Sequence, residues 1–214
     1  MKFHPSADFI LNLAILLLDV FALAVMLSGL QFADGRLALS DGGVEAFRYF
    51  TVDSNVLLGL VCLPYLVLLL RGGEIPQWLR CLKLMGTTGT TLTMVITIGF
   101  LAPAMKGNFL SLYRGGNFFF HLVIPILGIV SFCCLREGRG LGLRATLIAL
   151  IPVVVYAVCY LINILVHLEH GVVAEGTDWY GFLLFGLKSA PFAALAVIGL
   201  SWGLSLLLWL GGRR

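Results

Sequence analysis

The sequence predicts an all-α polytopic membrane protein, in which six transmembrane helices form one bundle and a single domain over residues 1–214. Of the 214 residues, 60% are hydrophobic and 12% are charged, whereas soluble domains carry about 25% charged residues. Helices are expected because lipid offers no hydrogen-bond partner to an unpaired backbone group. At about 20 residues for each span, a chain of this length holds roughly six helices and their short loops.

Charge and cysteine content exclude several classes of function. A net charge of +3 without a long basic tract gives no phosphate-binding face, so we expect no nucleic-acid partner. The five cysteines lie in or beside apolar runs, and no C-x-x-C pair or Cys/His cluster suggests a metal site. We therefore expect neither a metal nor an organic cofactor, and the oligomeric state stays open.

The first three apolar stretches are each long enough to cross a bilayer, and they cover residues 9–30, 49–70 and 78–102. The second ends at Arg71-Gly72-Gly73 and the third at Pro103, and glycine and proline commonly end helices. On the third stretch, Gly86 and Gly89 allow close approach of another helix. Residues at steps of three or four form one polar face, which we expect inside the bundle: Lys83, Thr87, Thr90 or Thr91, and Thr97.

The last three apolar stretches complete the six spans, and they cover residues 117–135, 145–167 and 190–210. Gly211-Gly212 is expected to end the sixth. A short aromatic run at 178–186 precedes the sixth stretch. Because this run is too brief to span, we expect it at the membrane interface.

The distribution of basic residues predicts the orientation. Six spans place both termini on one side, and nine of the fourteen Lys and Arg residues then fall on that side. Cytoplasmic loops carry the excess of Lys and Arg, so we expect cytoplasmic termini in an integral membrane protein.

This topology brings several polar residues to the outer ends of three spans. The second stretch begins with Thr51, Asp53, Ser54 and Asn55, the fourth begins with Asn117 and His121, and the fifth ends with His167. Thr51 and Asn55 share one helix face because they are four residues apart, and so do Asn117 and His121. Asp53 is expected to point about 200° away from Thr51.

A hydroxyl and an imidazole are the minimum parts of an activated nucleophile. His121 could take the proton from Thr51, and Asn55 or Asn117 could donate a hydrogen bond to the developing oxyanion. Two alternatives stay open at this point: Ser54 as the nucleophile and His167 as the base. The alternative is a purely structural role, in which each residue, taken alone, packs two helices together or forms a hydrogen bond with its own helix backbone.

Two segments carry a resemblance to a known family. In Phe47–Asn55, Thr51 follows an aromatic residue at the start of a span. In Asn117–Leu127, His121 lies four residues after an asparagine and shortly before Pro125. Together these segments resemble the family of androgen-induced and androgen-dependent TFPI-regulating proteins.

The resemblance implies a six-span membrane hydrolase that cleaves fatty acid esters of hydroxy fatty acids or similar acyl esters. It implies that Thr51 is the nucleophile and that His121 is its partner. The resemblance also extends to His167 and the loop after it, which look like a His-containing loop found later in the family's sequences. The run Val52-Asp53-Ser54-Asn55 is more similar to bacterial relatives, which implies a bacterial cell membrane.

A second class of function uses the same polar layer without chemistry. A small lipid-binding protein or transporter would bind its ligand there. Transporters commonly contain two similar halves, and residues 1–107 and 108–214 show no convincing repeat. The sequence therefore predicts a lipid-ester hydrolase and keeps lipid binding or transport as the alternative.

Overall fold

A computed structural model describes residues 5–29, 43–104, 109–113, 115–135, 137–169, 172–173, 176–180, 183 and 190–213. Six helical segments of this part are long and apolar enough to cross a membrane. The predicted all-α fold with six spans is therefore confirmed. The strands of the described part form one short antiparallel pair, β1 (Leu168–Glu169) with β2 (Val172–Val173).

Three of the spans are regular helices, which are α1 (Pro5–Leu27), α2 (Phe50–Leu70) and α9 (Ala190–Arg213). The other three are built from consecutive helical pieces. The third span consists of α3 (Gln77–Ile96), the π-helical η2 (Thr97–Leu101) and α4 (Ala102–Ala104). The fourth consists of α5 (Gly116–Phe118), the π-helical η4 (Phe119–Val123) and α6 (Ile124–Cys134). The fifth consists of α7 (Arg144–Ile148) and α8 (Ile151–Val166). Short 3-10 helices precede the second and fourth spans: η1 (Gly43–Arg48) and η3 (Phe109–Tyr113).

Proline and glycine have different effects on the fifth and sixth spans. The fifth span breaks between α7 and α8 because Pro152 lacks an N–H and its ring crowds the preceding turn. The sixth span continues through Gly211 and Gly212 to Arg213, so the expectation that these glycines end the helix is wrong. A Cβ atom at Gly212 would lie 2.8 Å from the Phe132 ring, so glycine here lets α9 pass close to α6.

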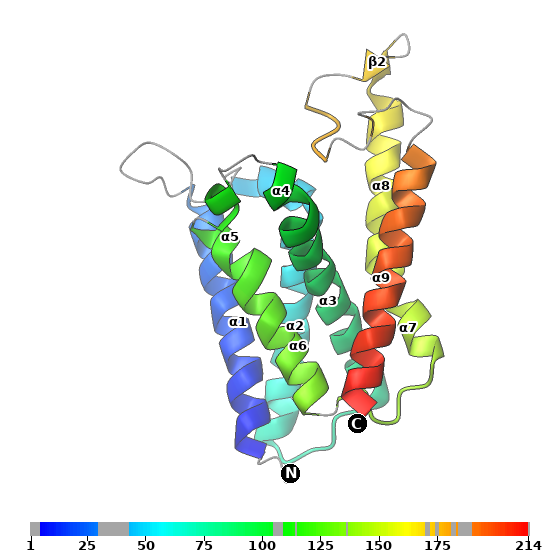
Figure 1. The fold of residues 1–214 in the computed structure, drawn as a ribbon. Coiled ribbons are helices and arrows are strands. Elements are labelled where there is room, and N and C mark those ends of the chain that lie inside the picture. Colours follow the sequence, from blue (N-terminus) through cyan, green and yellow to red (C-terminus); the bar gives the residue numbers. More distant parts are fainter. Residues whose placement is uncertain are drawn as a thin grey trace.

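The helices pack as a group of four with a pair at its side. Figure 1 shows α1, α2, α3 and the α5–α6 span together, with α8 and α9 lying beside α3. Both termini lie at one end of the bundle, as six spans require. We call this the terminal end and the opposite end, where α2 and η4 begin, the far end.

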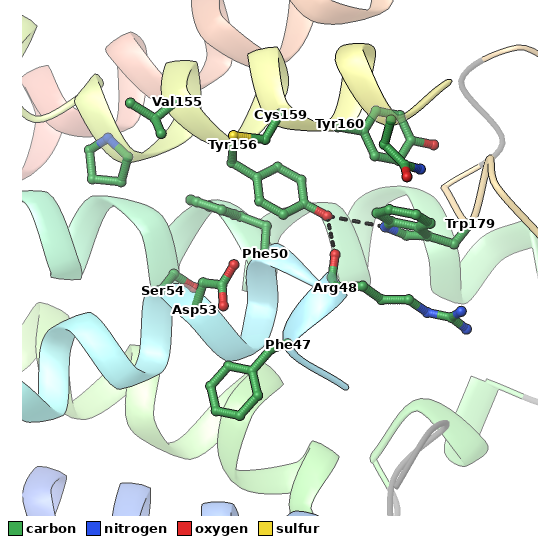
Figure 2. A pocket seen from close by; sticks show the side chains of 12 residues that line it. Phe47, Arg48, Phe50, Asp53, Ser54, Val155, Tyr156, Cys159, Tyr160 and Trp179 are labelled. Carbon is green, nitrogen blue, oxygen red and sulfur yellow. Dashed lines mark hydrogen bonds between the residues drawn. The ribbon is translucent and has the colours of Figure 1, made fainter. Parts of the chain in front are cut away.

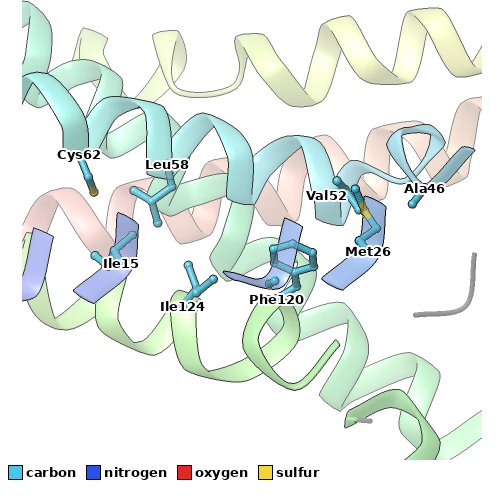
Figure 3. Close-up of a cluster of buried hydrophobic side chains, with 9 residues drawn as sticks. Ile15, Met26, Ala46, Val52, Leu58, Cys62, Phe120 and Ile124 are labelled. Atoms are coloured by element: carbon cyan, nitrogen blue, oxygen red, sulfur yellow. The ribbon is translucent and has the colours of Figure 1, made fainter. Parts of the chain in front are cut away.

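The main core cluster joins α1, α2, η4 and α6. Figure 3 shows its side chains meeting between these helices; they include Ile15, Met26, Val52, Leu58, Phe120 and Ile124. Helices α2 and α3 approach closely through two glycines, as predicted. A Cβ atom would lie 2.9 Å from the Leu58 Cα at Gly86, and 2.9 Å from the Ser54 Cβ at Gly89.

The polar face of α3 lies inside the bundle, as predicted. Its buried members are Lys83, Thr87, Thr90, Thr91 and Thr97. Lys83 is fully buried and its Nζ donates to the Asn12 Oδ1, while the Glu137 Oε1 lies 3.9 Å away. Asp19 lies elsewhere, packed against Gly59.

Candidate functional site

Thr51 and His121 lie at the same depth near the far end. Helix α2 and the fourth span both start at that end, so they run in the same direction. They touch where Leu58 packs on Gly128, since a Cβ atom at Gly128 would lie 3.1 Å from the Leu58 Cδ2. Thr51 and His121 each precede this contact by seven residues, which is about two turns and 10 Å of helix. The two residues therefore lie at a similar depth on neighbouring helices.

Asn55 joins the two helices at this depth. Its side chain is fully buried, and its Nδ2 donates to the Thr51 carbonyl at 2.7 Å and to the Phe120 carbonyl at 3.3 Å. One amide nitrogen thus holds together the backbones that carry Thr51 and His121. Both N–H bonds of Asn55 are used in this way, so its amide has no further hydrogen to offer an oxyanion. Its Oδ1 is buried and has no hydrogen-bond partner among the described residues.

The imidazole of His121 is oriented by the backbone. Its Nδ1 lies 3.0 Å from the Leu112 carbonyl in η3, and the residue is 9% exposed. A carbonyl can only accept, so Nδ1 must carry the hydrogen and Nε2 the lone pair. This is the tautomer that a general base needs. His121 also lies in a π-helical turn, a distortion that occurs frequently at functional sites.

The other two residues at this depth, Thr51 and Asn117, are half-buried. Within the described part of the chain, no hydrogen bond joins the Thr51 hydroxyl to the His121 ring. Catalytic hydrogen bonds are often long before substrate binds, so the placement at equal depth is the informative feature. Asn117 begins the same span, four residues before His121, and its side-chain amide bonds no other described residue.

Asp53 lies on a different face of α2 from Thr51, as the helical repeat predicts, and Ser54 follows it. They line a cavity of about 440 Å³ between α2 and α8. Figure 2 shows this cavity, whose other lining residues are Phe47, Arg48, Phe50, Pro152, Val155, Tyr156, Cys159, Tyr160, Asn163 and Trp179. Ser54 donates its hydroxyl hydrogen to the Thr51 carbonyl at 3.1 Å. Asp53 and Ser54 thus line a cavity that His121 does not line.

His167 lies at the exposed end of α8. Its Nδ1 and its backbone N–H both contact the Asn163 carbonyl, at 2.8 and 3.2 Å. The imidazole thus binds a carbonyl of the last turn of α8, and no described interaction links His167 to Thr51. His4 and His170 lie outside the described residues.

An aromatic cluster at the far end was not predicted in detail. The turn at Trp179 and Tyr180 folds onto α8 and the start of α2: the Trp179 Nε1 donates to the Tyr156 hydroxyl at 3.1 Å, and the Phe50 N–H donates to the Tyr180 hydroxyl at 2.9 Å. Burial raises the pKa of Tyr180 well above its ordinary value of 10.0, so this hydroxyl stays protonated. The four-residue spacing of Tyr156 and Tyr160 was the available sequence signal, since it places both rings on one face.

Comparisons with protein-family models, with curated proteins and with solved structures found no match for this chain. Among the described residues, no group of three or more His, Cys, Asp and Glu side chains is placed to hold a metal ion.

Proposed function

We propose that the chain is an intramembrane hydrolase of lipid acyl esters, with Thr51 as the nucleophile and His121 as the base. The observation that carries the proposal is the Asn55 amide, which binds the Thr51 and Phe120 carbonyls together. This link holds a hydroxyl and a correctly oriented imidazole at one depth, on neighbouring helices. The resemblance of both segments to a family of membrane threonine hydrolases supports the same assignment.

The reaction has two steps. His121 Nε2 takes the Thr51 hydroxyl proton as the threonine oxygen attacks the ester carbonyl, and the carbonyl electrons move to its oxygen. Because the Asn55 hydrogens are already used, the Asn117 amide is the donor we assign to this oxyanion. The intermediate collapses to acyl-threonine and the alcohol, which receives its proton from His121. Water then attacks the acyl-threonine with His121 again as base, and the carboxylic acid leaves.

The substrate class follows from the setting and from the resemblance. The site lies between apolar helices near one membrane surface, where an ester linkage can reach it while its acyl chains stay in lipid. We propose fatty acid esters of hydroxy fatty acids or similar acyl esters as substrates. The reaction needs no metal or organic cofactor.

Activity-based labelling tests the proposal. Purified protein is treated with a fluorophosphonate probe and assayed on a hydroxy-fatty-acid ester. We expect Thr51→Ala to abolish labelling and turnover, Thr51→Ser to retain both, and His121→Ala to lower turnover by about 10² to 10⁴. Ser54→Ala and His167→Ala are matched controls that should keep most of the rate, each variant being checked for monodispersity.

The outcomes are distinguishable. If His121→Ala keeps the wild-type rate, the assignment of the base is wrong. If Ser54→Ala loses labelling while Thr51→Ala keeps it, the nucleophile is Ser54. If the wild-type protein neither labels nor turns over esters but binds them, lipid binding or transport replaces hydrolysis.

We also propose that the termini are cytoplasmic and that the membrane is a bacterial cell membrane. Glu45 in η1 and Glu74 between α2 and α3 are both exposed and belong to opposite ends of the bundle. In a variant without the native cysteines, a cysteine at Glu45 should react with an impermeant maleimide added to intact cells, and one at Glu74 should not. The reverse pattern would place the site at the cytoplasmic surface.

A further inference from the structure

We propose that the cavity between α2 and α8 is a second binding site, which takes an organic ammonium group with Asp53 as its counter-ion. The cavity of about 440 Å³ is large enough for a small molecule and is separate from the Thr51 and His121 layer. The proposal goes beyond ester hydrolysis, because none of its residues takes part in that reaction.

The charge of Asp53 is the first argument. Among the described residues, none forms a hydrogen bond or ion pair with this carboxylate, although it lies within a membrane span and is half-buried. A carboxylate in such a place is costly without a cation, so a bound cation would stabilise it. Ionisable side chains within spans commonly mark ligand or ion sites.

The walls around Asp53 are the second argument, because they favour an organic cation over a metal ion. Figure 2 shows the carboxylate between Phe47 on one side and the rings of Phe50 and Tyr156 on the other, and all four residues line the cavity. Aromatic faces attract ammonium groups through their quadrupole. Calcium and magnesium need about six oxygen ligands. Of the other lining oxygens, the Ser54 hydroxyl lies beside Asp53 and already donates to the Thr51 carbonyl.

The shape of the cavity is the third argument. The Phe50 and Tyr156 ring centroids lie 5.2 Å apart, so these residues are level in the membrane. Asp53 lies three residues further along α2 and Pro152 four residues earlier on α8, so both are about 5 Å deeper. Trp179 and Asn163 lie at the far end. The Asp53 carboxylate therefore lies at the inner end of the cavity, beyond Phe50 and Tyr156.

The aromatic rings are held in place before any ligand binds. The Tyr156 hydroxyl donates to the Arg48 carbonyl and accepts from the Trp179 indole. The Arg48 guanidinium lies over the rings of Tyr49 and Trp179, at 5.1 and 5.7 Å, and Figure 2 shows it turned away from Asp53. Arg48, the one arginine that lines the cavity, thus points toward the rim of the cavity. The Asp53 carboxylate makes the inner end of the cavity negatively charged.

Titration with tetramethylammonium tests the site. The full chain in phosphatidylglycerol nanodiscs is titrated at constant ionic strength with sodium as the balancing ion, and tryptophan fluorescence is followed. We expect saturable binding that Asp53→Asn weakens at least tenfold. Glu45→Gln, which removes an exposed carboxylate at the same end, should change the affinity less than twofold. Phe47→Leu should weaken binding about threefold, from one lost cation–π contact.

Alkylation of Cys159 gives a second measurement that does not depend on fluorescence. Cys159 is exposed and lines the cavity, so saturating tetramethylammonium should slow its reaction with a small maleimide in a Cys134→Ser background. The proposal is overturned if tert-butanol, a neutral molecule of similar shape, binds as tightly as the cation. It is also overturned if a folded Asp53→Asn variant binds with wild-type affinity, or if Cys159 is not protected.

The source of the ammonium group is identified by changing the lipid. In phosphatidylcholine nanodiscs, a head group that enters the cavity would compete, and the apparent tetramethylammonium affinity would fall for the wild type. An unchanged affinity would identify a free solute as the ligand. Ester turnover is measured in parallel: loss of binding with turnover intact refutes this site alone, and loss of turnover with binding intact refutes the hydrolase alone.

Discussion

Removing the ammonium of Lys83 together with its partner carboxylate should destabilise the bundle less than the sum of the two separate removals. Lys83 is 0% exposed in the middle of four helices. Its Nζ donates to the Asn12 Oδ1, lies 3.9 Å from the Glu137 Oε1 and sits 4.8 Å from the Tyr65 ring centroid. Every contact of the charged nitrogen is therefore made inside the protein.

The magnitude follows from the separation of the charges. At 3.9 Å and an effective dielectric constant of about 20, two unit charges attract by about 4 kcal/mol. Breaking a buried pair by removing one partner generally costs about 3–5 kcal/mol, because the other charge stays buried. Lys83→Met keeps an unbranched side chain that is one atom shorter, and it leaves Glu137 with a single hydrogen bond from Ser131 at 3.0 Å. We expect a loss of about 3–5 kcal/mol for this variant, and a similar loss for Glu137→Gln.

The assay is a double-mutant cycle of unfolding free energies, measured by circular dichroism in mixed micelles of increasing dodecyl sulfate fraction. The double variant Lys83→Met/Glu137→Gln should be more stable than the sum of the single losses predicts, by about 2–4 kcal/mol. Arg71→Met is the matched control, since Arg71 is exposed at the terminal end, and it should change stability by less than about 0.5 kcal/mol. Additive losses would show that the two charges do not interact and would refute the reasoning.

Two further predictions use the same unfolding assay. Gly86→Ala should lose about 1–3 kcal/mol, because its Cβ would lie 2.9 Å from the Leu58 Cα; Gly203→Ala has no described atom within 4 Å and should be neutral. Equal effects would contradict the close contact of α2 with α3. Tyr180→Phe should lose about 1 kcal/mol, because the Phe50 N–H loses its acceptor, and an unchanged stability would show that water replaces the hydroxyl.

The six spans could be predicted because hydropathy acts over whole helices. Each predicted stretch corresponds to one helical span, with ends displaced by a few residues. The close approach at Gly86 and Gly89 was also predictable, since a missing side chain permits backbone contact wherever two helices cross. These features depend on local composition and need no knowledge of which helices are neighbours.

The partner of Lys83 could not be predicted, because it depends on a turn. Glu137 follows the fourth span in a short charged segment, a position typical of an exposed loop. In the structure its backbone N–H bonds the Phe132 carbonyl at 3.1 Å, which directs the chain back toward the bundle. The carboxylate is then 5% exposed and accepts from the Ser131 hydroxyl at 3.0 Å. Sequence spacing alone gives no signal for such a return.

At the start of α2, helical periodicity predicts which residues share a face but not which helix each face contacts. The repeat places Asp53 and Asn55 on different faces, and in the structure one lines the cavity beside α8 while the other bonds the Phe120 carbonyl. Periodicity could not say which helix each face would meet, because that depends on the packing of the fourth and fifth spans. One helical turn thus contributes residues to both of the proposed sites. Substitutions at Thr51 and at Asp53 should therefore affect different measurements, ester turnover in one case and ammonium binding in the other.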